Sequence, residues 1–319
     1  MSSIEKIMAR LEQNNRGKTE SDGATKAAES VPLPLAGRQR GNLGHDLKAA
    51  TGEAEVAERK PYAGEQTEKK PLALQLDRLE AAGYLAQDYE GSRQFSEFRR
   101  IKRPILKKAF SGERSAEELP GNLVMISSAV PGEGKTFCAI NLTLNMILER
   151  DITVMLMDVD CMRRSLSKLF GVDGQPGLVD VLEGECSIED VIVNTAIPQL
   201  KIFPAGRAHK HSAELLAGDR MKRLTAEIAE RYSDRIILMD APPLLAANDA
   251  EILTHYAGQA VIVVEADQTS QSLVQQALMS IEREKTSIGL VLNKRQGGRL
   301  AENDGYGYYY TSDGESRAD

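Results

Sequence analysis

The sequence predicts a three-layer α/β domain built around a mostly parallel central sheet. Between Gly121 and Lys294, short apolar runs rich in β-branched residues alternate with helical patterns. The apolar runs are continuous rather than alternating, which is typical of strands covered on both faces. Repeated strand–helix units imply parallel strands joined by right-handed crossovers.

Six apolar runs are the predicted strands of this sheet. They are NLVMISSA from Asn122, ITVMLMD from Ile152, LKIFPA from Leu200, RIILMDAPP from Arg235, QAVIVVEA from Gln259 and SIGLVLNK from Ser287. The segment KTFCAINLTLNMILER, which follows the first strand, places Phe137, Ile140, Leu144 and Leu148 on one helical face.

The chain before this domain predicts little regular structure. Ile4, Met8 and Leu11 have the spacing of one short amphipathic helix, which we assign to residues 1–13. Residues 14–94 are expected to form a flexible linker, because Gly, Pro, Ala, Lys and Glu dominate without an apolar period. Within it, LALQLDRL from Leu72 alternates briefly and is a candidate for docking on the domain.

The P-loop domain is assigned to residues 95–295. It opens with a strongly basic helix over 95–110, which Pro104 is expected to kink or end. Gly297 and Gly298 then release a flexible tail over 296–319, in which tyrosines stand among Gly, Ser, Asp and Glu. These tyrosines are Tyr306, Tyr308, Tyr309 and Tyr310. Without an apolar period the tail cannot build a core, so its rings need another explanation.

Bulk properties exclude several classes of protein. The net charge of -7 over 319 residues argues against nucleic acid as the main partner. Three scattered cysteines are too few for a disulfide framework or a zinc site. The N-terminus has acidic residues and no apolar region typical of a secretory signal, and no apolar run approaches the ~20 residues of a membrane helix. We therefore expect a cytoplasmic protein.

A phosphate-binding loop follows the first predicted strand. In MISSAVPGEGKTF, Gly134, Lys135 and Thr136 match the end of the P-loop pattern, while Ala129 replaces its first glycine. Glycines at 132 and 134 let backbone N–H groups surround phosphate oxygens. Lys135 is expected to reach the β- and γ-phosphates of ATP, and Thr136 to offer its hydroxyl to Mg²⁺. The predicted nucleotide site comprises Gly132, Glu133, Gly134, Lys135, Thr136, Phe137 and Asn293.

Carboxylates follow two further strands. Asp158 and Asp160 lie two residues apart, which on an extended chain points both to one side, toward the phosphates. One is expected to hold Mg²⁺ and the other to accept a proton from an incoming hydroxyl. Asp240 ends the fourth strand at the position of a second Mg²⁺ ligand. Asn293 ends the last strand, where its amide is a candidate for reading the base.

This set of motifs resembles the bacterial tyrosine kinases, which are P-loop autokinases of polysaccharide export. The resemblance rests on PGEGKT, on DxDxxR from Asp158, on the apolar strand ending in Asp240 followed by two prolines, and on the tyrosine cluster. It covers roughly residues 95–310. The start MSSIEK and the segment FRRIKRP are similar to those of the exosortase-associated (PEP-CTERM) tyrosine autokinases.

The resemblance implies a role for each matching residue. Lys135, Asp158 and Asp160 would be catalytic, Thr136, Asp158 and Asp240 would hold Mg²⁺, and the four tail tyrosines would be the phosphoacceptors. A helix with the family's E-x-x-R-x-x-R pattern builds a ring of subunits, and Glu97, Arg100 and Arg103 match it.

The resemblance also implies partners. They are further copies of the chain, a chain-length-determining inner-membrane protein as activator, and a cognate tyrosine phosphatase. The expected location is then cytoplasmic, peripheral to the inner membrane through that partner.

Two other functions fit parts of the same pattern. One is an ATPase switch of the MinD/ParA type, but those proteins carry an extra lysine where this chain has Val130. The other is a scaffold that binds nucleotide without turnover and grips a partner with the basic segment 99–108. The tyrosines of the tail have no role in such a switch, and a scaffold would not need the full set of catalytic groups that a kinase needs and this chain has.

Overall fold

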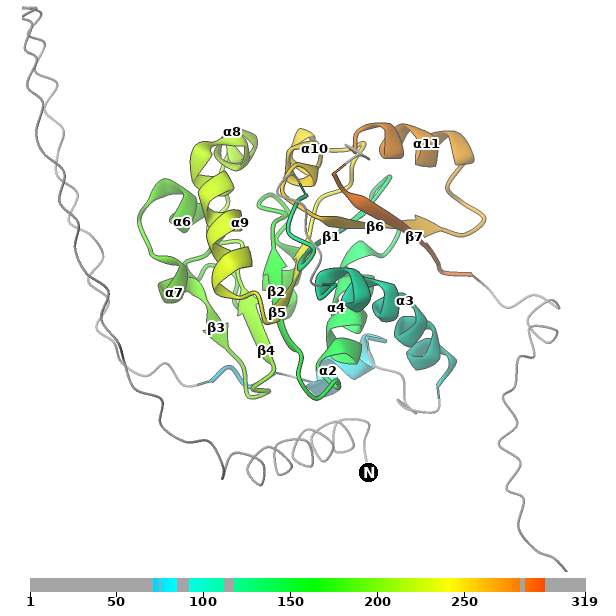
Figure 1. Cartoon of the computed structure of the whole chain (residues 1–319), viewed down its shortest axis with the longest axis horizontal. Coiled ribbons are helices and arrows are strands. Elements are labelled where there is room, and N and C mark those ends of the chain that lie inside the picture. The colour runs from blue at the N-terminus through cyan, green and yellow to red at the C-terminus, as the bar shows by residue number, and fades with distance from the viewer. Residues whose placement is uncertain (1–70, 75, 85–91, 112–117, 282–284, 296–319) are drawn as a thin grey trace, which may run out of the picture.

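The computed structural model describes residues 71–74, 76–84, 92–111, 118–281 and 285–295. They form a seven-stranded sheet with the strand order β3-β4-β2-β5-β1-β6-β7 (Figure 1). All neighbouring strands are parallel except β3, which is antiparallel to β4. The predicted fold class is therefore confirmed.

One or more helices follow most of the strands along the chain. The strands are β1 Leu123–Ser128, β2 Thr153–Asp158, β3 Val193–Asn194, β4 Leu200–Phe203, β5 Arg235–Asp240, β6 Gln259–Glu265 and β7 Ser287–Asn293. The helices are α2 Leu76–Ala81, α3 Arg93–Ala109, α4 Lys135–Met146, α5 Ser165–Leu169, α6 Leu178–Glu183, α7 Ile188–Val191, α8 Ser212–Ala217, α9 Asp219–Arg231, α10 Asn248–Thr254 and α11 Gln271–Met279.

The sheet separates two apolar cores, as continuous apolar strands require. Along β1, Leu123 and Met125 point into the core beneath α6 and α8–α11. Val124 and Ile126 point into the other core, beneath α3 and α4. Every residue of β1 is buried, so neither face of the central strands reaches water.

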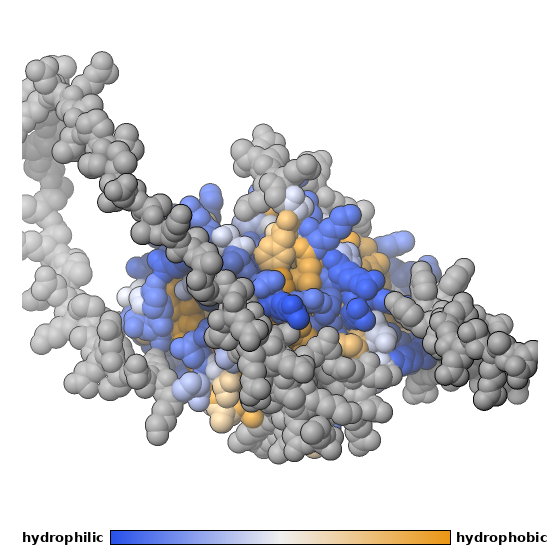
Figure 2. Space-filling model, turned by 60° about the horizontal axis from the view of Figure 1, so that its bottom comes forward, coloured by the Kyte–Doolittle hydropathy of each residue, from blue (hydrophilic) through white to orange (hydrophobic). Residues whose placement is uncertain are grey.

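The two outer strands differ from the prediction. All six predicted strands are present, but the two-residue β3 is too short to have produced a pattern. The prediction that strands are covered on both faces is wrong for β7, which pairs only with β6 among the described strands. There Leu290 and Leu292 are 56% and 61% exposed. On the face that Figure 2 shows, apolar residues emerge between hydrophilic ones.

Helix α3 continues past the proline that was expected to kink or end it. Ser92 caps its first turn by accepting a hydrogen bond from the Phe95 N–H, and the helix runs through Pro104 to Ala109. Pro104 and Arg100 are both exposed. Because Pro104 has no backbone N–H, the Arg100 carbonyl lacks its usual helical hydrogen bond. Water can satisfy that carbonyl. Phe98 and Ile105 are buried on either side of the break and hold the helix on the domain.

Residues just before α3 are also part of the domain. Leu72 donates its N–H to the Asn194 carbonyl and accepts from the Ala196 N–H, and Leu79 in α2 is buried. A flexible linker through residue 94 is therefore wrong at its C-terminal end, because residues 71–74 and 76–84 pack on the sheet. The docking expected of LALQLDRL is present. The predicted helix at 1–13 and the tail over 296–319 lie outside the described residues.

Within the described part of the chain, no helix is both long and apolar enough to cross a membrane.

The contact between α3 and α4 includes a buried cation. Lys102 is 4% exposed, and its Nζ donates to the Asn145 carbonyl at 2.8 Å and pairs with Glu149 at 2.7 Å. Gln259 adds a second tie by donating to the carbonyls of Ile105 and Gly121. These bonds fix α3 against the domain.

Lys102→Ala is expected to lower the free energy of unfolding by about 2–3 kcal/mol, because it removes a buried stem and leaves a carbonyl without this donor. Urea denaturation measures this value. Lys107→Ala, an exposed lysine on the same helix, should change it by less than about 0.5 kcal/mol. Equal effects of the two substitutions would show that the buried contact contributes nothing specific.

Candidate active site

The loop between β1 and α4 has a backbone that requires glycine. Gly132 and Gly134 both have φ of 95°, in the left-handed region that other residues rarely adopt. At Gly134 a Cβ would also lie 2.2 Å from Nδ2 of Asn293. No side chain caps α4 at Gly134, so the first N–H groups of this twelve-residue helix can receive an anion.

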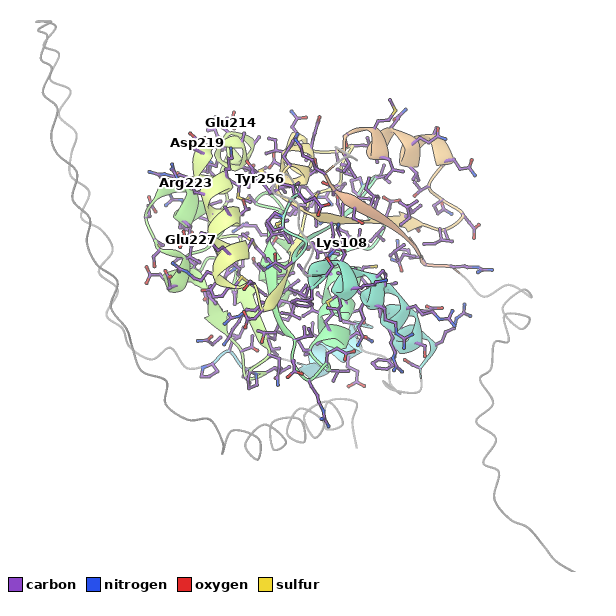
Figure 3. The ribbon with its side chains drawn as sticks, in the orientation of Figure 1. Lys108, Glu214, Asp219, Arg223, Glu227 and Tyr256 are labelled. Carbon is purple, nitrogen blue, oxygen red and sulfur yellow. The ribbon has the colours of Figure 1, made fainter. Side chains whose placement is uncertain are left out.

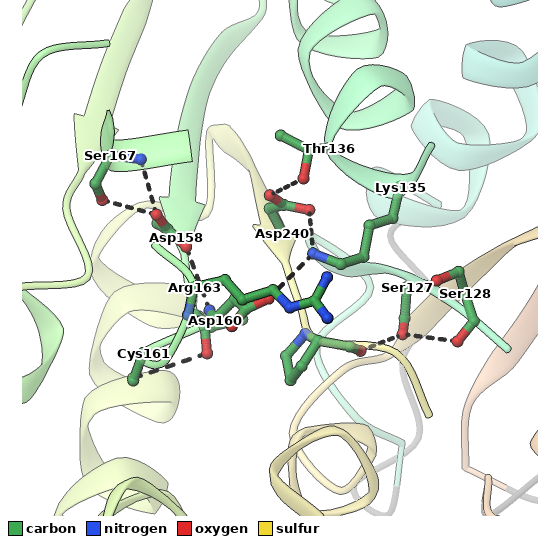
Figure 4. Close-up of polar contacts among 12 residues, drawn as sticks. Ser127, Ser128, Lys135, Thr136, Asp158, Asp160, Cys161, Arg163, Ser167 and Asp240 are labelled. Atoms are coloured by element: carbon green, nitrogen blue, oxygen red, sulfur yellow. Dashed lines mark hydrogen bonds and ion pairs between the residues drawn. The ribbon is translucent and has the colours of Figure 1, made fainter. Parts of the chain in front are cut away.

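Lys135 occupies the centre of a group of carboxylates (Figure 4). Its Nζ lies 3.3 Å from Asp160 Oδ2 and 3.6 Å from Asp240 Oδ1. The Thr136 hydroxyl donates to Asp240 Oδ2 at 2.7 Å. The lysine, the hydroxyl and these two acids come from three different strand ends, which the parallel sheet brings to one edge.

The two acids that follow β2 do not both face the lysine. Asp158 is fully buried and accepts bonds from the N–H and hydroxyl of Ser167 at 2.8 and 2.7 Å. Its other oxygen accepts from the Asp160 N–H. The prediction that both carboxylates point to one side is therefore wrong. The alternation of an extended strand stops at Asp158, the last residue of β2, and the chain turns before Asp160.

Burial changes the titration of two of these acids. Burial raises the pKa of the Asp158 carboxyl, against the bonds from Ser167 that lower it. Burial also raises the pKa of Asp240 from 3.8 to about 7, although Lys135 opposes this change. A fully buried Asp240 beside Asp158 and Asp160 holds negative charge that one lysine does not balance.

These residues fit a magnesium ion. Asp240 Oδ1 is buried and has no hydrogen-bond partner among the described residues. Thr136 and Asp240 present hard oxygen donors next to each other, and the local excess of carboxylates favours a divalent cation. Asp158 fits less well, because the Ser167 and Asp160 donors already occupy its oxygens.

Glu133 has a different position from the one the sequence indicates. Its side chain is 1% exposed and turns inward, where it accepts from the N–H groups of Val130 and Glu265 and from the Thr269 hydroxyl. It ties the P-loop to the segment after β6. The Asn293 amide donates to the Glu133 carbonyl at 2.8 Å and ties the same loop to β7. The sequence gives no signal for these contacts, because their partners come together only in the folded chain.

A cavity of about 670 Å³ lies beside the P-loop. Phe137 and Asn293 both line it, together with residues of α3 and of the end of β7. Its volume is in the range of small-molecule sites. Phe137 packs against the rings of Tyr84 and Phe98, with centroids 5.6 and 6.3 Å away. Phe98 and Tyr84 were not predicted to be near the site, because their segments precede the P-loop by tens of residues.

The predicted oligomerisation residues lie on α3, where Glu97 and Arg100 line the cavity. Glu97, Arg100 and Arg103 are exposed on α3, and Glu97 pairs with Arg93 one turn earlier at 2.7 Å. Ser167, which the sequence analysis missed, connects Asp158 to the segment after β4 by also accepting from the Ala205 N–H. The tyrosines at 306, 308, 309 and 310 lie outside the described residues.

Ser167→Ala is expected to lower the free energy of unfolding by about 1–3 kcal/mol, because it leaves the buried Asp158 carboxyl with one hydrogen-bond donor fewer. Chemical denaturation checks this value. Ser165→Ala is the matched control, since Ser165 lies in the same helix and has no side-chain bond to Asp158. A loss no larger than that of the control would contradict the role of the Ser167 hydroxyl.

The raised pKa of Asp240 predicts a specific pH dependence of stability. Between pH 4 and pH 7 the folded state keeps a proton that the unfolded chain has released, so this contribution is greatest at low pH and is lost as pH rises through about 7. Without metal or nucleotide, wild type should therefore lose about 2–3 kcal/mol relative to Asp240→Asn between pH 5 and pH 8.

Urea unfolding of both proteins at the two pH values measures that difference. Asp234→Asn, which removes an exposed carboxylate just before β5, should keep a constant difference from wild type. Parallel pH profiles of wild type and Asp240→Asn would refute the raised pKa.

Known proteins resemble this chain over the same region. The family model described as an AAA domain matches residues 121–294. The tyrosine-protein kinase YwqD of Bacillus subtilis (strain 168) is 31% identical over 191 residues, which are 60% of this chain and 78% of YwqD. The tyrosine-protein kinase ptk of Acinetobacter johnsonii is 32% identical over 176 residues, which are 55% of this chain but only 24% of ptk.

A solved structure has the same fold. The kinase domain of the Escherichia coli tyrosine kinase ETK superposes with a TM-score of 0.53 and 27% sequence identity, covering 62% of this chain and 76% of that structure.

Proposed function

The chain belongs to the AAA-domain proteins and to the bacterial tyrosine-protein kinases, and from that premise we propose that it transfers the γ-phosphate of ATP to its own tyrosines at 306, 308, 309 and 310. The observation that carries this proposal is the position of Lys135, within 3.6 Å of both Asp160 and Asp240. This position supports Lys135 as the phosphate-binding cation, with a metal-binding acid and a proton acceptor beside it at one edge of the sheet.

The three acids have different surroundings, and we assign them different roles on that basis. Asp160 is the proposed proton acceptor, because it faces Lys135, while Asp158 holds the loop in place through Ser167. Thr136 and Asp240 are the proposed Mg²⁺ ligands, and the ion would neutralise charge on the phosphates. The N–H groups of the P-loop and of α4 would bind the phosphates, and Phe137 and Asn293 would border the base in the cavity.

The transfer joins the tyrosine Oη to the γ-phosphorus and breaks its bond to the β–γ bridging oxygen. The phenolic proton passes to Asp160, and ADP leaves. No protein residue becomes covalently modified other than the accepting tyrosine, so positioning and charge supply the catalysis.

The family resemblance also supports a proposed assembly, partners and location for the protein. We propose that Glu97, Arg100 and Arg103 assemble copies of the chain in a ring, so that one tail enters a neighbouring site. The same proposal includes two partners, which are an activating chain-length-determining protein of the inner membrane and a cognate phosphatase. It also includes a location at that membrane and a role in exopolysaccharide export. The assignment to the exosortase-associated (PEP-CTERM) subgroup belongs to it as well.

Incubation of the purified chain with ATP and Mg²⁺ should produce phosphotyrosine that antibody detects. Lys135→Met should reduce the initial rate at least about 100-fold, because it removes the cation that holds the phosphates. Asp160→Asn should reduce it by about 10²–10⁴ through loss of the proton acceptor. Deletion of residues 296–319 should abolish the signal.

Asp267→Asn is the matched control, because this carboxylate follows β6 at the same edge but is exposed and away from Lys135. It should keep the wild-type rate. Phosphotyrosine that persists in Lys135→Met would falsify transfer by this site. Consumption of ATP without any phosphotyrosine would instead favour an ATPase switch.

A further inference from the structure

Helix α3 carries a concentration of positive charge in an acidic protein. Its 17 residues, RQFSEFRRIKRPILKKA, contain seven lysines and arginines and one glutamate, whereas the whole chain has a net charge of -7. Lys102 is buried, and the other six cations are exposed. The overall charge of the chain therefore does not describe this surface.

Four of the exposed cations form a stripe. Arg93, Arg100 and Lys107 recur every seven residues, and Arg103 lies between the last two, so all four share one side of the helix. The opposite side carries the buried Phe98 and Ile105. At 1.5 Å per residue this basic stripe, Arg93–Arg100–Arg103–Lys107, is about 21 Å long.

Most of the stripe has no counter-charge on the domain. Arg93 pairs with Glu97. Within the described ranges, Arg100, Arg103 and Lys107 form no ion pair, although the neighbouring Lys108 pairs with Glu118. Three cations on one helical face repel one another, and an anion of matching spacing would relieve that repulsion.

The chain leaves the domain beside this stripe. Arg295, the last described residue after β7, lines the 670 Å³ cavity together with Arg93 and Arg100. Helix α3 and the end of β7 accordingly lie on the same side of the molecule (Figure 1). Tyr306 is 11 residues beyond Arg295, a span of up to about 36 Å in an extended chain. That reach exceeds the length of the stripe.

The charge of the tail is complementary and increases on modification. Residues 296–319 contain five Asp and Glu and two Arg. Each phosphotyrosine adds about -1.5 to -2 charges and three strong acceptor oxygens. Arginine guanidinium groups bind phosphate through paired, charge-assisted hydrogen bonds. The unphosphorylated tail has only carboxylates for such bonds, so we expect it to bind arginine less strongly.

From these observations we propose that the basic stripe of α3 is a docking site for the phosphorylated tyrosine tail. The proposal rests on the proposed autophosphorylation as the source of the phosphates. Arg100 and Arg103 also belong to the proposed contact between subunits, so a docked tail occupies the side chains that hold the ring together. Phosphorylation then releases the subunits by competition for these arginines, beyond simple repulsion between charged tails.

Binding is tested with a fluorescent peptide of residues 301–319, phosphorylated at all four tyrosines or at none, added to the full-length Lys135→Met chain. Fluorescence anisotropy should show the phosphorylated peptide binding at least about tenfold more tightly. Arg100→Gln/Arg103→Gln should weaken its binding about tenfold or more. Arg93→Gln/Lys107→Gln, which keeps Arg100 and Arg103 but removes the cation paired with Glu97, should weaken it about fivefold or more.

Lys222→Gln/Arg223→Gln is the matched control, because it removes two exposed cations from α9. Figure 3 shows Arg223 on α9 well separated from Lys108 at the end of α3. This variant should bind the phosphorylated peptide within twofold of the parent chain. Circular dichroism of each variant should match the parent, since every substituted residue is exposed.

Equal affinity for the two peptides, or unchanged binding by both α3 variants, would overturn the proposal. So would vesicles of phosphatidylglycerol that bind through Arg100 and Arg103 while the phosphorylated peptide does not, because the stripe would then face an anionic membrane. The synthetic peptide and the Lys135→Met chain require no phosphotransfer. A failure of the kinase assay and a failure of this docking are therefore distinguishable.

Discussion

The burial of Lys135 among carboxylates is the constraint on which the rest of the structure depends. Asp158 and Asp240 are fully buried, and Asp160 is 2% exposed, at an edge where three strands end. Several buried acids near one cation are costly unless each has a partner. The surrounding structure supplies only some of these partners. Asp240 Oδ1 lies 3.6 Å from Lys135 Nζ and has no hydrogen bond among the described residues. A divalent metal ion would offset this excess of negative charge.

Side chains around the P-loop hold this arrangement in place. Ser167 fixes Asp158 from behind and connects it to the segment after β4. Glu133 connects the P-loop to the segment after β6, and Asn293 connects it to β7. Most of these contacts join a side chain to the backbone of another segment. The loops at the carboxyl edge are thus bound to one another, which keeps the phosphate-binding N–H groups oriented before a ligand arrives.

Helix α3 links the interior of the domain to its surroundings. Its inner side is anchored by Lys102 and Ile105 and borders the cavity next to Phe137. Its outer side presents the basic stripe and the E-x-x-R-x-x-R residues. The proposed subunit contacts and the proposed tail docking would both act on a helix that packs directly against α4, which begins with Lys135. Binding on the outer side of α3 would therefore be separated from the P-loop by one layer of packed side chains.

The sequence by itself determined the fold class, six of the seven strands and the residues of the P-loop. Short continuous apolar runs between turn residues are typical of buried strands, although β7 is partly exposed. The φ of 95° at Gly132 and Gly134 favours the glycines that the pattern contains. Tertiary structure alone decided which acid faces Lys135, because strand alternation ends at Asp158. It also decided that the Glu133 side chain turns inward and that Ser167 bonds to Asp158. The exposure of β7 and the continuation of α3 past Pro104 are likewise tertiary features. These features depend on which segments become neighbours after folding, and local residue spacing carries no information about that.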